Sequence, residues 1–138
     1  IISQEGLHQA LQHRLESVEK RAGLSAVLEN NLTSILPVHF EAQLYGIAQE
    51  SLNNVLKHSG ANSVTIILNQ EEKHLVMEII DDGHGFDYDG QVSRGFGLLN
   101  MKERAEQIGG SVDIISKPGQ GTRIIARIPL IESLISEK

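Results

Sequence analysis

The sequence contains no cysteine, no tryptophan and no long run of hydrophobic residues. The absence of cysteine excludes disulfide bonds and metal sites built from thiolates. No segment approaches the roughly 20 apolar residues that a membrane-spanning helix needs, and none has the pattern of a signal peptide. Basic residues are also in the minority: the sequence has 12 lysines and arginines and 18 acidic residues, which gives a formal net charge of −6. This balance argues against nucleic acid as a partner, since phosphate-backbone binding needs a basic surface.

Motifs of several common enzyme classes are missing as well. The six histidines are scattered and lack the H-E-x-x-H spacing of a zinc peptidase. There is no G-x-S-x-G, the nucleophile turn of a serine hydrolase, and no G-K-[S/T] to complete a P-loop. A histidine metal site, a serine hydrolase and a P-loop NTPase are therefore unsupported.

The residues that are present indicate one globular domain. Hydrophobic residues make up 40% of the 138 residues, which is enough for a sizeable core. We expect a single domain over residues 1–130, followed by a tail over 131–138. The chain opens with IISQ and has no initiator methionine, so we expect it to be part of a longer protein.

Periodicity and turn residues predict three helices and five strands. Leucines at helical spacing mark the first helix, while apolar runs bounded by polar turns mark the strands. Pro37 is expected to open the second helix, and Gly60 to end it in a left-handed conformation. The predicted helices cover about 5–23, 38–58 and 97–108, and the predicted strands cover 24–30, 63–69, 75–80, 111–116 and 122–130.

The arrangement of these elements predicts the fold class. Adjacent strands joined by tight turns indicate antiparallel pairing. The helices alternate with the strands too loosely for a doubly wound parallel sheet. We therefore predict an α+β fold: a two-layer α/β sandwich whose mixed, mostly antiparallel sheet is covered by helices on one face. The first strand has to join this sheet through a longer connection.

A polar stripe on the second helix has two interpretations, a solvated face or a set of ligands. Glu50 and Asn54 are four residues apart and share a helix face, with Lys57 and His58 about one turn further on. The adjacent pair Asn53 and Asn54 is unusual in mid-helix, because asparagine is a poor helix former. A carboxylate and an amide oxygen one turn apart suit Mg²⁺, which takes few protein ligands.

The segment DDGHGF, residues 81–86, directly follows a predicted strand. Asp81 at the strand end can accept a hydrogen bond from an amino group, and Gly83 and Gly85 permit close backbone approach. A turn that ends the strand explains the same residues equally well. The segment alone does not decide between a ligand pocket and a turn.

Two further glycine motifs follow. Gly95 and Gly97 precede the third helix, whose first backbone N–H groups, from Gly97 and Leu98 onward, attract phosphate. This G-x-G is not a dinucleotide fingerprint, because Asn100 stands where the third glycine would be and no strand precedes it. The G-Q-G-T segment that ends at Thr122 is explained by a hairpin turn.

The order of the four motifs is more specific than any one of them. Their succession over residues 50–122 resembles the Bergerat-fold (GHKL) ATPases, which include gyrase, heat-shock chaperones, mismatch-repair proteins and histidine kinases. The segments AQESLNNVLKHSGA, DDGHGF, GFGLLNMKERAEQIGG and PGQGTRIIARIP look like the catalytic and ATP-binding domain of a sensor histidine kinase. Within that group they are similar to the subfamily whose partners are nitrate/nitrite-type (LuxR-type) regulators. The likeness covers about residues 7–130.

This resemblance implies a role for each matched residue. Glu50 corresponds to the carboxylate that orients the attacking group, and Asn54 to the Mg²⁺ ligand. Asp81 corresponds to the residue that recognises the adenine amino group. The other matches are Lys57 and His58 near the phosphates, Gly83 and Gly85 at the adenine pocket, Gly95 and Gly97 at the hinge of the ATP lid, Leu98 at the helix start, and Thr122 at the adenine end.

The resemblance also implies the partners. ATP and Mg²⁺ would bind this chain, and a histidine on a separate dimerisation domain would accept the phosphoryl group before a response regulator does. None of the six histidines is followed by an acidic residue, so the phosphoacceptor is expected outside the chain. The chain alone is expected to be a cytoplasmic monomer without membrane contact that binds ATP but does not autophosphorylate efficiently. Its ATP lid would be residues 87–94.

Two alternative classes share parts of this pattern. An anti-sigma-factor serine kinase has the same fold and about this length, but the MKERAEQIGG segment and the missing initiator methionine weigh against it. A non-catalytic nucleotide-binding module would not need the catalytic set, yet Glu50, Asn54 and Asp81 are all present.

Overall fold

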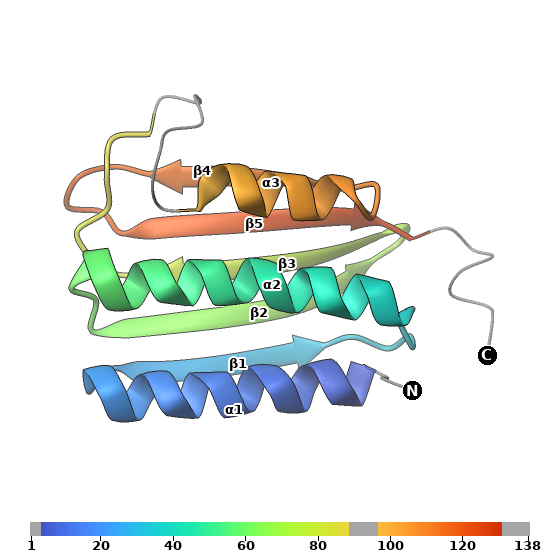
Figure 1. Cartoon of the computed structure of the whole chain (residues 1–138), viewed down its shortest axis with the longest axis horizontal. Helices are drawn as coiled ribbons and strands as arrows, with labels where there is room; N and C mark the ends of the chain where they lie inside the picture. The colour runs from blue at the N-terminus through green and yellow to red at the C-terminus, as the bar shows by residue number, and fades with distance from the viewer. Residues whose placement is uncertain (1–3, 89–96, 131–138) are drawn as a thin grey trace.

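The computed structural model describes residues 4–88 and 97–130, and within them three α-helices cover one face of a five-stranded sheet (Figure 1). A one-turn π-helix, η1, directly continues the second helix. The helices are α1 (Gln4–Ala22), α2 (Val38–Asn54), η1 (Val55–Ser59) and α3 (Leu98–Glu106). The strands are β1 (Ser25–Asn31), β2 (Ser63–Glu71), β3 (His74–Asp81), β4 (Ser111–Ser116) and β5 (Thr122–Pro129).

The sheet is mixed and mostly antiparallel, in the order β1-β2-β3-β5-β4. Only β1 and β2 pair in parallel, and α2 forms the crossover between them. The other neighbouring pairs are antiparallel. The predicted α+β class, the two-layer sandwich and the long connection of the first strand are therefore confirmed.

The second helix differs from its prediction at its C-terminal end. The α-helix ends at Asn54, and residues 55–59 form the wider π-turn before the chain leaves at Gly60 with φ of +62°. The left-handed Gly60 was expected, but the change of helix type was not. Single π-turns are rare in helices and occur frequently at functional sites.

The core lies between the sheet and the helices, where each helix buries one stripe and strands β2 and β4 bury alternate residues. In β2, for example, Val64, Ile66 and Leu68 are fully buried. Burying one such side chain contributes about 1.5–3 kcal/mol before conformational entropy is subtracted. Within residues 4–88 and 97–130, no helix combines the length and apolarity needed to cross a membrane.

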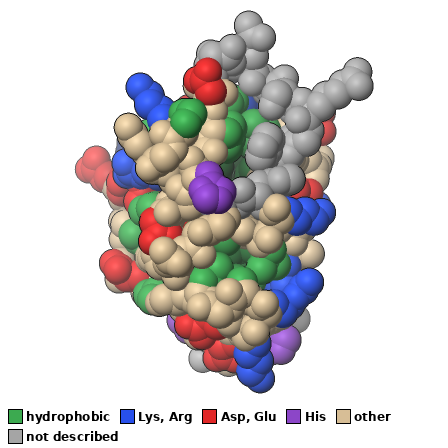
Figure 2. All heavy atoms as spheres, turned by 90° about the vertical axis from the view of Figure 1, so that its left-hand side faces the viewer, with side chains coloured by type: hydrophobic (Ala, Val, Ile, Leu, Met, Phe, Trp, Pro, Cys, Tyr) green, Lys and Arg blue, Asp and Glu red, His purple; other side chains and the backbone are tan. Residues whose placement is uncertain are grey.

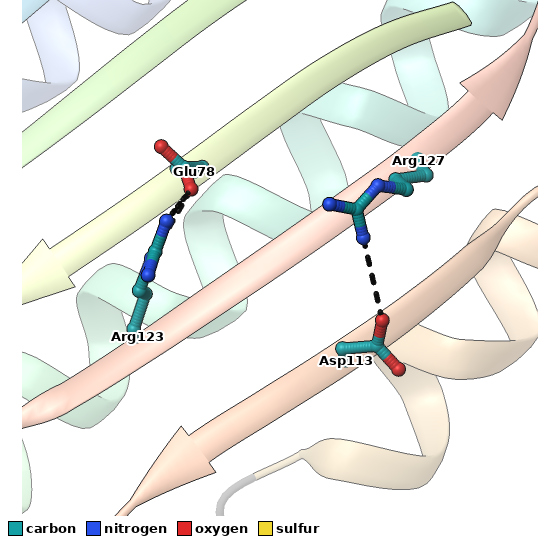
Figure 3. Close-up of polar contacts among 4 residues, drawn as sticks. All are labelled: Glu78, Asp113, Arg123 and Arg127. Carbon is teal, nitrogen blue, oxygen red and sulfur yellow. Dashed lines mark hydrogen bonds and ion pairs between the residues drawn. The ribbon is translucent and has the colours of Figure 1, made fainter.

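Among the residues that the structure describes, no helix lies over the opposite face of the sheet, and charged side chains form two ion pairs on it. Figure 3 shows Glu78 of β3 beside Arg123 of β5, and Asp113 of β4 beside Arg127 of β5, with 3.6 Å between the charged groups of the second pair. Ile125 lies opposite both acidic residues in the strand pairing and is only 6% exposed. These exposed ion pairs contribute little energy individually, but their long side chains shield the apolar residue beneath them.

Glu41 is a buried carboxylate far from the predicted site, in the first turn of α2. Its side chain is 2% exposed, and neither carboxylate oxygen has a hydrogen bond of acceptable geometry. Burial raises the pKa of Glu41 from its ordinary value of 4.5 to about 7, although the nearby backbone N–H of Leu7 opposes the shift. The folded protein therefore holds a proton here that the unfolded chain releases near pH 4.5.

This difference predicts a pH dependence of stability. Between about pH 4.5 and 7 the folded state binds more protons than the unfolded chain, so the free energy of unfolding falls as the pH rises through this window. Glu41→Gln removes the effect and is expected to gain about 2 kcal/mol over the wild type at pH 8. Urea unfolding at pH 5, 6, 7 and 8 measures it, with the exposed Glu106→Gln as the matched control. Parallel pH profiles for all three proteins would contradict the assignment.

Candidate functional site

One end of the sandwich gathers most of the predicted site residues. It is the left-hand end of Figure 1, where α2 passes into η1, β3 ends at Asp81, β5 begins at Thr122 and α3 begins after Gly97. Figure 2 shows this end face on: hydrophobic and neutral polar groups fill much of the middle, and charged groups of both signs lie mostly toward the margins. The topology thus brings together motifs that are up to 72 residues apart in the sequence, from Glu50 to Thr122.

Asp81 points toward the helix side of the sheet, because it lies on the same face of β3 as the buried Ile79. Its Oδ1 accepts the backbone N–H of Gly83 at 2.8 Å. Burial raises the pKa of Asp81, and the charge of Asp82 adds to this, while the N–H groups of Gly83 and Thr122 oppose it. A carboxylate with reduced hydration at a strand end is well suited to accept a hydrogen bond from a ligand's amino group.

Ser116 completes a polar row with Asp81 and Thr122 across β3, β5 and β4. Its hydroxyl lies 2.8 Å from that of Thr122, accepts the N–H of Phe86 at 2.8 Å and donates to the carbonyl of Gly121 at 3.1 Å. Because this one proton goes to the carbonyl, the Thr122 hydroxyl is the donor between the two side chains. Ser116 therefore fixes both the loop after β3 and the turn before β5.

The sequence analysis missed Ser116, although a signal was present. Residues of β4 alternate, and its inward positions are Val112, Ile114 and Ser116, all buried. A polar residue at the last inward position of an otherwise apolar alternation needs a hydrogen-bonding partner. That pattern marks Ser116 as a residue with a local role.

The DDGHGF segment and the G-Q-G turn pack against each other with their backbones. Gly85 has φ of +68°, and a Cβ placed on it would lie 2.1 Å from the carbonyl oxygen of Lys117. Gly121 has φ of +73°, and a Cβ there would lie 2.2 Å from the carbonyl oxygen of Asp81. The N–H of Gly119 also donates to the carbonyl of His84 at 2.5 Å. Two glycine motifs distant in the sequence therefore form one compact unit beneath Asp81.

Asp82, for which the sequence suggested no role, anchors this loop to the start of β2. Its Oδ1 accepts the N–H groups of Asn62 and Ser63 at 2.8 and 2.9 Å, and its Oδ2 accepts the Ser63 hydroxyl at 3.1 Å. The N–H groups of Ser63 and Asn62 lower the pKa of Asp82. The two adjacent acids thus differ: Asp81 faces the helices, whereas Asp82 holds the loop.

Glu50 lies half-buried between α2 and the start of α3. Its Oε2 accepts the side-chain amide of Asn100 at 3.1 Å. Gly97, at φ of +62°, lies directly against it, since a Cβ there would be 2.2 Å from Oε1. The side chain of Leu98 is 1% exposed and belongs to the core, so only its backbone is available to a ligand.

The remaining predicted residues are placed less completely. Asn54 is the last residue of α2, one turn from Glu50, and Lys57 is exposed on η1. His58 also belongs to η1, but its side chain lies outside the described part, as does the whole of Gly95. Of the predicted lid, residues 87–94, only Asp87 and Tyr88 are described.

Over residues 4–88 and 97–130, no group of three or more His, Cys, Asp or Glu side chains could hold a metal ion. Mg²⁺ commonly takes only one or two protein ligands and obtains the others from substrate phosphates or water. The oxygen donors Glu50 and Asn54, one turn apart on α2, fit Mg²⁺ bound in that way.

A hollow of about 350 Å³ lies at the same end but opens on the other face of the sheet. Its lining includes Ile80, Ile115 and Arg123, whose side chains alternate away from the helices, and also the site residues Asp81, Ser116 and Thr122. The Asp81 side chain points to the opposite face. The hollow therefore reaches the row of Asp81, Thr122 and Ser116 from the face of the sheet opposite the helices.

Comparison with known proteins identifies the family to which the chain belongs. Residues 40–132 match the family model described as histidine kinase-, DNA gyrase B-, and HSP90-like ATPase. Over 126 residues the chain is 36% identical to the sensor histidine kinase LiaS of Bacillus subtilis. The matched region covers 91% of this chain and 35% of LiaS. Over 95 residues it is 43% identical to the sensor protein VraS of Staphylococcus saprophyticus. This matched region covers 69% of this chain and 27% of VraS. The chain thus spans about a third of these curated relatives.

Solved structures share the fold at lower identity. The histidine kinase domain of the blue-light activated histidine kinase of Erythrobacter litoralis aligns with a TM-score of 0.75 and 18% identity, over 96% of this chain and 65% of that chain. The histidine kinase AdeS of Acinetobacter baumannii aligns with a TM-score of 0.76 and 14% identity, over 94% and 66% of the two chains. These structures support the fold alone.

One prediction from the sequence is not supported. The expected subfamily was that of nitrate/nitrite-type regulators, but the relatives are LiaS and VraS, which form a different subfamily.

Proposed function

The chain belongs to the family of histidine kinase-, DNA gyrase B- and HSP90-like ATPases, and from this premise we propose that it is the ATP-binding catalytic domain of a sensor histidine kinase. The observation that carries the proposal is the convergence of Asp81 and Glu50, with the glycine motifs around them, at one end of the sheet. The named relatives are sensor kinases, which favours this function over a serine kinase.

The adenine of ATP would bind at the β3–β5 end. The Asp81 carboxylate would accept a hydrogen bond from the exocyclic amino group. Gly83 holds one carboxylate oxygen at 2.8 Å, so the direction of the acceptor is set before ATP binds. Ser116 and Thr122 support the neighbouring backbone through their 2.8 Å contact.

The phosphates would lie toward α2, η1 and the first turn of α3. The first N–H groups of α3, beginning with Gly97 and Leu98, have no acceptor within the helix itself and favour bound phosphate. Lys57, exposed on η1, and His58 would add positive charge or hydrogen bonds there. An acidic protein needs such local groups to hold a polyanion, because its formal net charge is −6.

Asn54 would hold Mg²⁺, which when bound would supply charge neutralisation at the phosphates. Glu50 would orient the attacking imidazole by accepting one ring N–H, leaving the other ring nitrogen to attack phosphorus. The new bond is N–P, the bond to the leaving ADP oxygen breaks, and the imidazole proton is lost to a base or to water. The chain's contribution is thus positioning and electrostatics.

In the full-length protein, the acceptor histidine would belong to a dimerisation domain, and a response regulator would receive the phosphoryl group from it. Support comes from the chain's histidines, none of which precedes an acidic residue, and from its coverage of about a third of its sensor-kinase relatives. The isolated chain would then be a monomer that acts on this domain in trans.

Two measurements test the function. Titration calorimetry with ATP is expected to show one site whose affinity falls at least tenfold when EDTA removes Mg²⁺. Incubation with radiolabelled ATP and the separately produced dimerisation domain is expected to label that domain on histidine. Absence of both ATP binding and labelling would overturn the proposal, and labelling of serine would replace it with the serine kinase.

The adjacent residues Asn53 and Asn54 provide a matched pair of variants for testing the Mg²⁺ dependence of ATP binding. Asn54→Ala is expected to remove most of the Mg²⁺ dependence of ATP binding. Asn53→Ala removes a different contact, the 3.0 Å hydrogen bond from Arg14 of α1, and is expected to keep the Mg²⁺ dependence. Equal metal titrations for both variants would contradict Asn54 as the ligand.

A further inference from the structure

We propose that Asn100 is a positioning residue that holds the Glu50 carboxylate in the orientation used for phosphoryl transfer. The inference rests on the proposed function and adds a residue to it. The sequence motifs gave Asn100 no role of its own. It was noted only as the residue that stands where a dinucleotide motif would have its third glycine.

The contacts around Glu50 define the orientation of its carboxylate. The Asn100 amide donates to Oε2 at 3.1 Å. On the other side, the backbone of Gly97 lies so close to Oε1 that a Cβ would approach it to 2.2 Å. One oxygen is therefore held by a hydrogen bond from α3, and the other lies close to the backbone of Gly97, the residue that precedes α3.

The same α3 surface contacts α2 along a regular line. Gln43 receives a hydrogen bond at 3.1 Å from Arg104 and donates one at 2.7 Å to Gln107. Two turns further along α2 is Glu50, and two turns back along α3 is Asn100. Between the pairs, the Arg104 guanidinium lies over Gly46, where a Cβ would be 2.5 Å from it. The two helices run antiparallel, and these contacts recur along their interface. Asn100 lies at the end of the interface that is next to the site.

An amide is chemically suited to this task. A free glutamate side chain samples several rotamers, and a carboxylate that orients a nucleophile loses effectiveness when misplaced. A neutral N–H donor fixes the direction of Glu50 without neutralising its charge. A lysine or arginine at position 100 would instead form an ion pair and compete with the substrate for the carboxylate.

The test uses the full-length kinase that carries this chain, with Asn100→Ala and Asn100→Asp. Asp has the shape of Asn but no N–H donor and adds a like charge beside Glu50. Both variants are expected to lower kcat for autophosphorylation about tenfold while changing KM for ATP less than twofold, because orientation and not nucleotide binding is lost. In a Glu50→Gln background, Asn100→Ala is expected to cause no further loss, since its partner is already altered.

Gln107→Ala is the matched control. It removes the 2.7 Å hydrogen bond at the other end of the same helix interface and is expected to leave kcat and KM unchanged. Asn100 is exposed, so its variants are expected to unfold within a few degrees of the wild type. Equal kcat values for the Asn100 variants and Gln107→Ala, or a change confined to KM, would overturn the inference alone. A wild-type kinase that cannot phosphorylate histidine would overturn the proposed function as well.

Discussion

Replacing Asp81 with asparagine is expected to weaken ATP binding about 100-fold while leaving the fold intact. Asp81 faces only donors: the N–H of Gly83, which its Oδ1 accepts at 2.8 Å, the N–H of Thr122, and the proposed adenine amino group. An asparagine keeps one acceptor oxygen and gains an NH₂ group. Whichever way the amide turns, one donor then faces another donor across the site.

Asp82→Asn is the matched control for this experiment. Asp82 accepts hydrogen bonds from Asn62 and Ser63 and does not face the helices. Its substitution is therefore expected to lower thermal stability slightly and to leave ATP affinity within about threefold of the wild type. Calorimetry with ATP and thermal unfolding of both variants provide the comparison. Wild-type affinity for Asp81→Asn would rule out the adenine assignment.

Gly121→Ala is expected to cost at least about 3 kcal/mol of stability and to abolish ATP binding. Its φ of +73° disfavours any other residue, and its new Cβ would lie 2.2 Å from the carbonyl oxygen of Asp81. That oxygen belongs to the backbone and cannot move like a flexible side chain. The start of β5 would be pushed away from the end of β3, which separates Thr122 from Asp81.

A substitution at Gly119, in the same turn, distinguishes the effect of backbone strain from the effect of the steric contact. It has a similar φ of +79°, but a Cβ there would have nothing within 4 Å. Gly119→Ala is therefore expected to cost only about 1 kcal/mol and to retain ATP binding. Chemical denaturation of both variants gives the difference that belongs to the steric contact. Equal losses at the two positions would mean that backbone strain, and not the contact with Asp81, explains the need for glycine in this turn.

The sequence by itself determined the element order and the α+β class. Helices bury residues every three or four positions and strands bury every second one, and both periods are local properties of the chain. The order of motifs from Glu50 to Thr122 also predicted the family, which the match over residues 40–132 shows. The predicted subfamily was not supported, because short motifs that surround a common site do not distinguish the branches of a family.

Only the tertiary structure decided which residues support the site. DDGHGF is both a turn and one wall of the site: Gly85 and Gly121 pack its backbone against the next hairpin while Asp81 faces the helices. The contacts of Ser116 with Phe86 and of Asn100 with Glu50 join residues 30 and 50 positions apart. Such contacts depend on how strands pair and helices pack, and no local period of the sequence encodes them.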